Sequence, residues 1–428
     1  MQKILSIAAL LAIGHAACAQ TPVDKIINAT EVERIEKTLS ADDMQGRRTF
    51  TPGIDKAADF IAAEFKKAGI QPLKGDSYFQ EFAMLKPKFL SANGTLNGNP
   101  IPEKNIVALS SQNTIKVTDK SGWEKVNVGE SDTLFPVVMR LLDTKKNYFV
   151  TVNEKYGRMF NGLKRFREQT FESPANIVLV LTNETPNTFS VEFNQEVNRA
   201  PLKNVVGIIP GNKKKDEYVI FSGHYDHLGI GKPNAEGDSI FNGANDDASG
   251  VTAVIMLAQY YAKQKNNERT LVFAAFTAEE VGGFGAKHFS EQYDPSKVMA
   301  MFNIEMIGTE SKWGTNSAFI TGYEKTDMGT ILEKNLKGSA FKFYPDPYPD
   351  QQLFYRSDNA TLARQGVPAH TISTSKMDSE KFYHTVDDEI ETLDMKNMAE
   401  IIKSIALSAT SIISGKDTPS RVDTKQLR

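Results

Sequence analysis

The chain has 428 residues, of which 40% are hydrophobic and 24% are charged, and its formal net charge is −3. This length exceeds a typical domain of ~100–200 residues and allows a sizeable buried core, so we expect one large domain with an insertion or two domains. The charges are nearly balanced and Lys and Arg form no block, which argues against nucleic acid as a partner.

The first twenty residues have the pattern of a secretory signal peptide. Lys3 precedes an apolar run at residues 4–13, and Ala17 and Ala19 fit an A-x-A cleavage site. The run is too short to span the ~30 Å core of a bilayer, and no other segment is apolar for long enough to be a transmembrane helix. We therefore expect residues 1–19 to be removed and the mature protein to be exported, to the periplasm or out of the cell.

Cys18 is the only cysteine of the sequence. A lipoprotein signal with an acylated Cys18 is the alternative to simple cleavage, but His15 is a poor residue at the position three before that cysteine. Cleavage after Ala19 leaves a mature chain without thiols, so any metal ion must be bound by histidines and carboxylates.

Two amphipathic helices are expected after the signal peptide. Thr30 and Glu33 have the spacing of a capping box at the start of the first helix. The second helix covers the apolar repeat from residue 54 onward and ends at Gly69, a plausible C-cap.

The middle of the chain has a less regular pattern. Short β-like runs at residues 147–152 and 176–182 flank a basic amphipathic run at 157–168, whose Lys and Arg are expected to form a solvated helix face. We interpret residues 104–185 as an inserted α+β subdomain. The alternating run at 188–193 is expected to be a strand of a hairpin, in either the insert or the main domain.

After Leu202, short apolar strands alternate with amphipathic helices. Strands are expected at residues 204–211, 217–223, 270–277, 298–308 and 368–374, and a helix at 249–264. This alternation indicates an α/β fold with a mixed, mostly parallel central sheet and helices on both faces. Residues 20–103 and 186–428 are expected to form this main domain, with functional groups in loops at the carboxyl ends of the strands.

Each predicted strand end is followed by a potential metal ligand or acid–base group. These groups are His224, Asp226, Asp246, Asp247, Glu279, Glu280, Glu305 and His384. Such a set suits two divalent ions, because zinc accepts imidazole nitrogen and carboxylate oxygen, and one carboxylate can bridge ions ~3.5–4 Å apart. Asp246 and Asp247 repel one another unless a cation compensates them. We therefore expect one of the two to bridge cations and its neighbour to face backbone or helix N-terminal NH groups.

Each piece alone has a simpler interpretation. The acidic pairs could be helix caps or exposed helix starts, which are commoner uses of such residues. Asp387 and Asp388 are expected to form a plain turn or cap. His227, like His288 and His370, lacks a comparable context. His288 lies in an amphipathic helix and His370 in a strand, so these two are expected to be structural. Only the joint pattern supports a metal site.

Five motifs occur in the order GHYDHLG, NGANDDASG, TAEEVGGFGAKHF, FNIEMIG and FYHTVDD. They resemble the motifs of the exported double-zinc exopeptidases of metallopeptidase family 28, whose relatives include bacterial leucyl aminopeptidases and glutamate carboxypeptidases. The likeness covers about residues 200–410, and the early helices also resemble those of the family. It implies the zinc-exopeptidase, phosphorylase/hydrolase-like fold, two Zn²⁺ ions and a peptide substrate, and it leaves open a protease-associated domain at 104–185.

The resemblance implies five metal ligands, which are His224, Asp246, Glu280, Glu305 and His384. Asp246 would bridge the ions, His224 and Glu305 would complete the first site, and the other two residues would complete the second. The family usually has Asp where this chain has Glu305. The additional methylene changes the reach or denticity of that ligand, which leaves the occupancy or the identity of the first ion open.

Other roles follow from the same resemblance. Glu279 would be the general base, and Asp226 would hydrogen bond to His224 and orient its ring. Asp247 would lie outside the ligand shell. Ser357 and Asp358 resemble a late Ser-Asp motif of the family and would line the pocket floor or support the site, although Asp358 could equally cap a helix.

The implied activity is the removal of N-terminal residues from peptides. Two zinc ions would lower the pKa of a water molecule from ~15.7 toward neutrality, and Glu279 would pass its proton to the leaving amine. A glutaminyl cyclase of the same fold, with a single zinc ion, is an alternative, but His224 and Glu305 count against it. A non-catalytic binding module is a second alternative, although every ligand position holds a competent residue. Carboxypeptidase or dipeptidase action, side-chain specificity and oligomeric state stay open.

Overall fold

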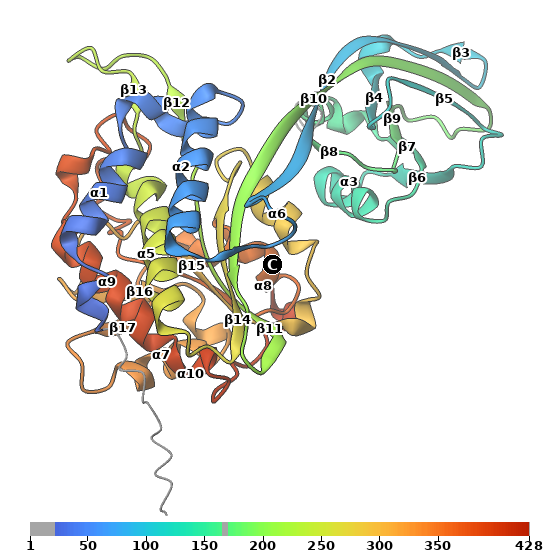
Figure 1. Cartoon of the computed structure of the whole chain (residues 1–428). Helices are drawn as coiled ribbons and strands as arrows, with labels where there is room; N and C mark the ends of the chain where they lie inside the picture. Colours follow the sequence, from blue (N-terminus) through green and yellow to red (C-terminus); the bar gives the residue numbers. More distant parts are fainter. Residues whose placement is uncertain (1–21, 165–169, 428) are drawn as a thin grey trace, which may run out of the picture. The chain divides into compact units, whose positions relative to one another are not determined.

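A computed structural model describes residues 22–164 and 170–427 of the chain. The predicted signal peptide with Cys18, and part of the basic run at 157–168, lie outside these described residues. The chain forms two compact units, one comprising the chain up to Tyr78 together with Val205 onward, the other comprising Phe79–Asn204 (Figure 1). No helix of the described part has the length and apolar character required to cross a bilayer.

The first unit is built on a mixed, mostly parallel sheet, which confirms the predicted fold class. Its strands follow the order β17 (Lys342–Pro345), β16 (Ser317–Ile320), β18 (Ala369–Ser373), β15 (Val298–Ile304), β11 (Lys214–His224), β14 (Arg269–Phe276) and the end of β10 (Phe189–Ile209). β11 pairs in parallel with both β14 and β15, and β15 pairs in parallel with β18. β16 is antiparallel to β18, and β10 is antiparallel to β14 and to the short β1 (Gln71–Pro72).

Helices cover both faces of this sheet (Figure 1). Because successive side chains of a strand point to opposite faces, neighbouring residues of β11 meet different helices. Phe221 stacks on Tyr261 of α5 (Ser249–Gln264), with ring centroids 5.6 Å apart. Ile220 instead belongs to a core cluster with Phe289 of α6 (Phe284–Ser290) and Leu362 of α8 (Asn359–Ala363).

The remaining helices of the first unit pack around α5 or against one another. They are α1 (Ala29–Leu39), α2 (Pro52–Ala68), α7 (Met328–Leu336), α9 (Met395–Ser408) and α10 (Thr410–Ile413). α2 ends at Gly69, whose φ of 77° lies in the left-handed region, as predicted for a C-cap. The predicted capping box of Thr30 and Glu33 is wrong. α1 begins one residue before Thr30, because the side chain of Asn28 accepts the NH of Glu31 at 3.1 Å.

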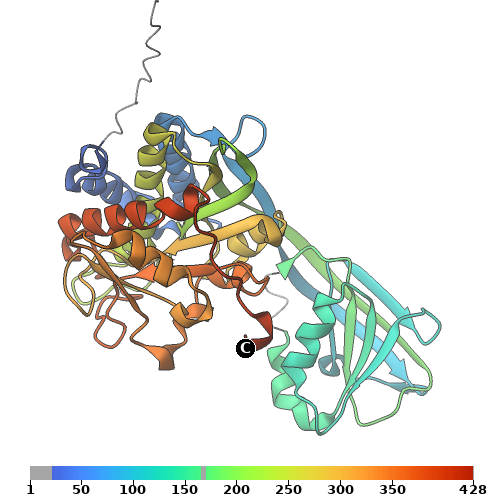
Figure 2. The same ribbon diagram turned by 90° about the horizontal axis from the view of Figure 1, so that it is seen from below.

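The second unit contains a small sheet with a layer on each face. The sheet order is β4 (Ile106–Leu109), β9 (Ile177–Leu181), β7 (Tyr148–Val152) and β6 (Glu124–Val128). One face packs against α3 (Leu134–Asp143) and α4 (Gly157–Gly162), which Figure 2 shows along one side of the sheet. The other face packs against β2 (Phe79–Leu96), β5 (Thr114–Thr118) and the first part of β10. Two-residue strands complete the unit, β3 (Asn99–Pro100) and β8 (Thr170–Phe171).

The boundaries of this unit differ from the expected insert at 104–185. The long strands β2 and β10 extend well beyond the expected ends, and their apolar side chains complete the core of the small sheet. The run at 188–193, left open by the sequence, is part of β10 and pairs with β5.

The carboxyl ends of the parallel strands deliver the predicted site residues to one edge of the first unit's sheet. His224 is the last residue of β11, and Glu305 directly follows β15. Glu279 and Glu280 lie just beyond β14, and Asp246 lies in an irregular turn, Ala244–Ala248, before α5. The alternation of strands and helices therefore positions the site, as the sequence predicted.

A buried arginine connects the N-terminal segment to these strand ends. Arg47 is 0% exposed and lies in the 3-10 turn Asp42–Arg47. Its guanidinium donates to the carbonyls of Leu39 (2.7 Å), Tyr225 (2.9 Å), Asn242 (2.5 Å) and Gly243 (2.8 Å). Tyr225 follows His224 directly, and Gly243 lies three residues before Asp246, so one cation fixes the backbone beside two predicted ligands.

We predict that Arg47→Met lowers the free energy of unfolding by at least about 3 kcal/mol, because it leaves four carbonyls without their charged donor in a buried place. Denaturant unfolding monitored by circular dichroism measures the change. Arg48→Met is the matched control, since Arg48 is exposed, and its unfolding free energy should stay within about 0.5 kcal/mol of the native value. Equal stability of the two variants would contradict the role given to Arg47.

Candidate metal centre

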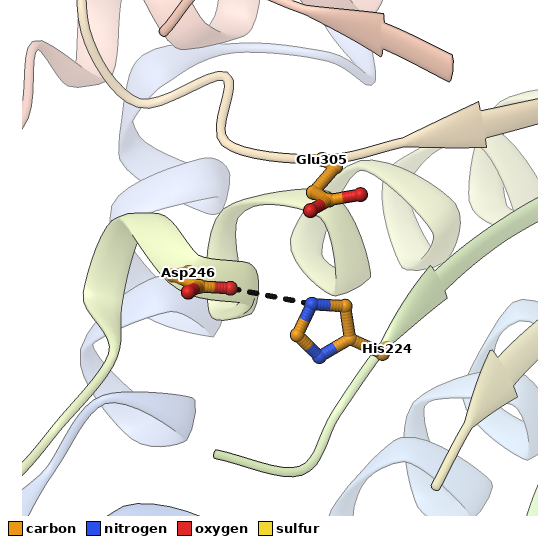
Figure 3. Close-up of side chains that lie close together, drawn as sticks. All are labelled: His224, Asp246 and Glu305. Carbon is orange, nitrogen blue, oxygen red and sulfur yellow. Dashed lines mark ion pairs between the residues drawn. The ribbon is translucent and has the colours of Figure 1, made fainter. Parts of the chain in front are cut away.

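Three predicted ligands from distant parts of the chain meet at the edge of the sheet (Figure 3). His224, Asp246 and Glu305 each offer one ligand atom, and these atoms all lie within 4.8 Å of one another. The His224 Nε2 and Asp246 Oδ1 atoms are 3.2 Å apart. His224 is 1% exposed and Asp246 is 2% exposed, so the cluster is buried.

The donor atoms of this cluster fit a divalent cation. The Nε2 atom of His224 and the Oε2 atom of Glu305 have no hydrogen-bond partner among the described residues, although both are buried. Unpartnered polar atoms are costly inside a protein unless another group, such as a metal ion, satisfies them. Imidazole nitrogen and carboxylate oxygen are ligands that zinc accepts. The additional methylene of Glu305 does not keep its carboxylate away from the other two groups.

A second cluster shares Asp246 with the first. The Nε2 atom of His384 lies 3.2 Å from Asp246 Oδ2 and 3.2 Å from Glu280 Oε2. The two oxygens of Asp246 therefore face different histidines, Oδ1 toward His224 and Oδ2 toward His384. This is the arrangement expected of a carboxylate between two cations.

His227, which was not among the predicted ligands, also belongs to this second cluster. It is 1% exposed, and its Nδ1 atom lies 2.8 Å from Glu280 Oε1 and 3.9 Å from Asp246 Oδ2. His227, Asp246 and Glu280 form a second group able to hold a metal ion. Its position three residues after His224, in the same strand-end loop, is the signal that could have identified it.

The orientation of His224 differs from the predicted one. Its Nδ1 atom lies 3.1 Å from the backbone carbonyl of Asp226, whereas the Asp226 carboxylate is 3.9 Å away, beyond hydrogen-bond distance. A carbonyl only accepts, so Nδ1 carries the proton and Nε2 keeps its lone pair for a cation. The Asp226 carboxylate is engaged elsewhere, because it accepts the backbone NH groups of Glu279 (3.0 Å) and Glu280 (3.3 Å).

Asp247 faces backbone NH groups, as the sequence predicted for the neighbour of the bridging residue. Its carboxylate accepts from His224 (3.1 Å), Met306 (3.1 Å) and Gly250 (3.0 Å), the last of these in the first turn of α5. One buried carboxylate thus joins the ends of β11 and β15 to the start of the helix.

Asp388, like Asp247, is a buried aspartate that accepts backbone NH groups. The prediction of a plain turn missed this role. It is 1% exposed, and its carboxylate accepts the NH groups of Asn245 (2.8 Å) and Asp246 (3.0 Å). It therefore ties the loop that carries His384 to the turn that carries Asp246. Nothing in the sequence separates this aspartate from an ordinary helix-capping residue.

The carboxylates and histidines of the two clusters and of their supporting loops differ in how strongly they hold their protons. Burial raises the pKa of Asp226 and of Asp388 to about 6. Burial opposes ionisation of Glu280 as well, but hydrogen bonds from His227 and His384 hold its pKa at about 2. His384 donates hydrogen bonds to the carboxylates of Asp246 and Glu280, and these bonds raise its pKa to about 10. The carboxylates thus draw positive charge to this place, which protonated histidines or metal cations can supply.

Both clusters open onto a cavity of about 520 Å³ in the first unit. Asp246, Glu279, Glu280, Glu305 and His384 all line it. Glu279 makes no metal group with the others, and burial raises the pKa of its carboxyl well above the usual range. The wall also includes Tyr383, whose ring stacks on that of His384 at 3.9 Å.

Ser357 and Asp358 line the same cavity, as the resemblance implied. The Ser357 hydroxyl accepts from Asn303 at 2.7 Å and hydrogen bonds to the carboxylate of Glu305, which it orients. Asp358 is 2% exposed, and neither of its carboxylate oxygens has a partner among the described residues. The alternative of a helix cap fails, because the Asp358 side chain makes no capping hydrogen bond to α8.

Three residues at the site have left-handed backbone conformations that side chains rarely adopt. They are Ala278 (φ 60°), Met306 (φ 54°) and His384 (φ 59°). Ala278 precedes Glu279 and Met306 follows Glu305, so each position is a predicted site residue or its neighbour. Such conformations cost of order 1–3 kcal/mol each and persist only where the surrounding contacts impose them.

The sequence of the site-bearing region matches a known family. Residues 204–409 match the model of Peptidase family M28, and this range contains every predicted metal ligand. A probable zinc metalloprotease of Pyrenophora tritici-repentis is 32% identical over 143 residues, which cover 32% of this chain and 32% of that protein. The chain thus spans about a third of the length of that relative.

Two further similarities extend over most of the chain. A probable leucine aminopeptidase of Arthroderma otae is 24% identical over 377 residues, which cover 81% of this chain and 92% of that protein. The solved structure of an aminopeptidase from Aneurinibacillus sp. strain AM-1 has a TM-score of 0.54 at 18% identity, covering 95% of this chain and 98% of the other, and shares its fold. Residues 204–409, which carry the site, are thus similar to peptidase family M28.

Proposed function

We propose that the protein is a zinc-dependent aminopeptidase that holds two zinc ions and removes N-terminal residues from peptides. The observation that carries this proposal is the position of Asp246, whose two carboxylate oxygens lie 3.2 Å from His224 and 3.2 Å from His384. The family match supports a peptidase, and the similarity to a probable leucine aminopeptidase supports action at the amino terminus.

Five residues would hold the two ions. Asp246 would be shared, His224 and Glu305 would complete one site, and Glu280 and His384 would complete the other. His227 donates from Nδ1 to Glu280 Oε1, so it would leave Oε2, the oxygen nearest His384, for the ion. When bound, two zinc ions supply Lewis-acid polarisation of the scissile carbonyl and a water of lowered pKa.

Glu279 is the proposed general base. It lines the cavity beside the predicted ligands without belonging to either metal group, and burial keeps its proton affinity high. The Asp226 carboxylate accepts the backbone NH groups of Glu279 and Glu280, so it would fix the base relative to the adjacent ligand. Glu279 would take a proton from the attacking water and pass it to the leaving amine.

The acidic lining of the cavity favours a substrate with a free amino terminus. Burial raises the pKa of Asp358 to about 8, and its oxygens, which lack any partner among the described residues, can accept hydrogen bonds from an ammonium group in the cavity. The glutaminyl cyclase alternative needs a single zinc ion, and it does not account for a complete first cluster of His224, Asp246 and Glu305. A binding module without catalysis would have no need of Glu279 beside the metal ligands.

We predict that aminoacyl p-nitroanilides and peptides with free amino termini are hydrolysed, whereas the same peptides with acetylated amino termini are not. A zinc chelator should abolish the activity and added zinc should restore it, because the ions supply the Lewis acid. Release of p-nitroaniline and mass spectrometry of the peptides measure the reaction. Cleavage of the acetylated peptides at equal rate, or pyroglutamate formation alone, would contradict the proposal.

For Glu279→Gln we expect a fall in kcat of about 100-fold to 10,000-fold, because the amide cannot accept the proton. Zinc analysis of the native protein and of this variant should give two ions per chain in both, which separates the loss of the base from loss of metal. Glu291→Gln is the matched control, since Glu291 is exposed beyond α6. Full activity of Glu279→Gln would exclude Glu279 as the base.

We also propose that the protein is exported through the signal pattern of residues 1–19, with acylation of Cys18 as the less favoured alternative. The apolar run at residues 4–13 and the small residues Ala17 and Ala19 support export. Mass spectrometry of protein recovered from the periplasm or medium should show a chain that begins at Gln20. A lipid-modified chain beginning at Cys18, or an uncleaved chain in the cytoplasm, would contradict this prediction.

A further inference from the structure

The cavity beside the candidate metal centre has walls of both charge signs. Its acidic residues are all buried or half-buried, and they are Asp246, Glu279, Glu280, Glu305 and Asp358. Its basic residues are Lys287, Arg356 and Arg364, and all three are exposed. The acids are covered and the bases face solvent, so the solvent-exposed charge of the cavity wall is the positive charge of these three bases, which form its rim.

The two arginines of the rim are not neutralised by the protein. The Arg356 guanidinium donates to the Gln351 side-chain oxygen, a neutral group, at 3.3 Å. Within the described part of the chain, neither Arg356 nor Arg364 forms an ion pair. The half-buried Lys376 of the same unit, by contrast, is paired with Glu310 at 2.8 Å. Exposed guanidinium groups beside a cavity are therefore available to a ligand.

Both arginines are attached to segments that form the cavity wall. Arg356 directly precedes Ser357, which hydrogen bonds to the carboxylate of Glu305. Arg364 lies one helical turn after Thr361, a lining residue that hydrogen bonds to Ser290 of α6 at 2.7 Å. The rim is thus held by the same short stretch, residues 356–364, that supports the metal centre.

We propose that Arg356 and Arg364 bind a carboxylate of the substrate on the leaving side of the scissile bond, so that the enzyme prefers short peptides with a negative charge in that position. This inference rests on the proposed function. A guanidinium fork matches the geometry of a carboxylate and forms charge-assisted hydrogen bonds with it. The negatively charged far end of a short peptide complements the exposed guanidinium groups of this basic rim.

The size of the cavity defines the class of substrate further. A volume of about 520 Å³ lies within the ~300–1,000 Å³ of pockets that enclose small ligands. A cavity of that size accommodates a peptide of a few residues, whose free C-terminal carboxylate would reach the rim. An acidic side chain after the scissile bond would present the same chemical group. The C-terminal carboxylate and the acidic side chain must therefore be distinguished by experiment.

Two pairs of substrates test the C-terminal carboxylate and the acidic side chain separately. The first pair is Leu-Gly-Gly and its C-terminal amide, and the second is Leu-Glu-amide and Leu-Gln-amide. We expect kcat/KM to be about tenfold higher for the charged member of at least one pair, through KM rather than kcat. In the Arg356→Ala/Arg364→Ala double variant the ratio should fall to near one, and the lysine double variant should recover part of it.

Arg140→Ala is the matched control, because Arg140 is an exposed arginine on α3 of the second unit. It should leave the ratio unchanged. Thermal unfolding of each variant reports whether the fold is retained. A ratio near one in the native enzyme for both pairs, or an unchanged ratio in the double alanine variant, would overturn the inference.

Binding measurements separate this inference from the proposed function. Calorimetric titration of the zinc-free native protein with the same peptides requires no turnover, and the charged peptide should bind about tenfold more tightly than its amide. If no peptide is hydrolysed with zinc while this preference persists, the proposed function fails and the carboxylate subsite stands. If peptides are hydrolysed without any charge preference in either assay, the proposed function stands and the subsite is wrong.

Discussion

Buried carboxylates at the edge of the main sheet each require a partner that carries full or partial positive charge. Most of the site geometry follows from which partner each carboxylate has. Asp226, Asp247 and Asp388 are satisfied by backbone NH groups, which bring partial positive charge from neighbouring loops. Asp246 and Glu280 face histidines instead, and one oxygen of Glu305 has no hydrogen-bond partner in the part of the chain that the structure describes. The carboxylates that accept backbone NH groups hold the loops in place, whereas the carboxylates that face histidines or have such an oxygen can bind cations.

This division explains why residues from distant parts of the chain hold fixed positions. The Asp247 carboxylate joins β11, β15 and α5, and Asp226 joins β11 to the loop after β14. Arg47 fixes the backbone beside His224 and Asp246 from the outside. The geometry of the predicted ligands is therefore set by groups that would not touch an ion. One of them, Asp247, also accepts the NH of Met306, whose backbone is left-handed.

The sequence predicted those parts of the structure that depend on local patterns. Alternating apolar strands and helices gave the sheet, and the strand ends identified His224, Asp246 and Glu305. What it could not predict depends on tertiary contacts. Spacing does not tell whether the His224 ring meets the carboxylate or the backbone carbonyl of Asp226. Arg47 gave no local signal, because its four carbonyl partners lie up to 196 positions away, and the insert boundaries were hidden by long strands shared with its core.

The chain leaves the first unit and returns to it at neighbouring positions. The backbone carbonyl of Tyr78, where the chain leaves the first unit, accepts the NH of Val206, where the chain has just returned, at 2.7 Å. Exit and re-entry are thus adjacent, and a turn of a few residues could bridge the gap. The intervening segment is in effect a detachable module, whose replacement or loss would leave the peptidase framework with its hydrogen-bonded seam intact.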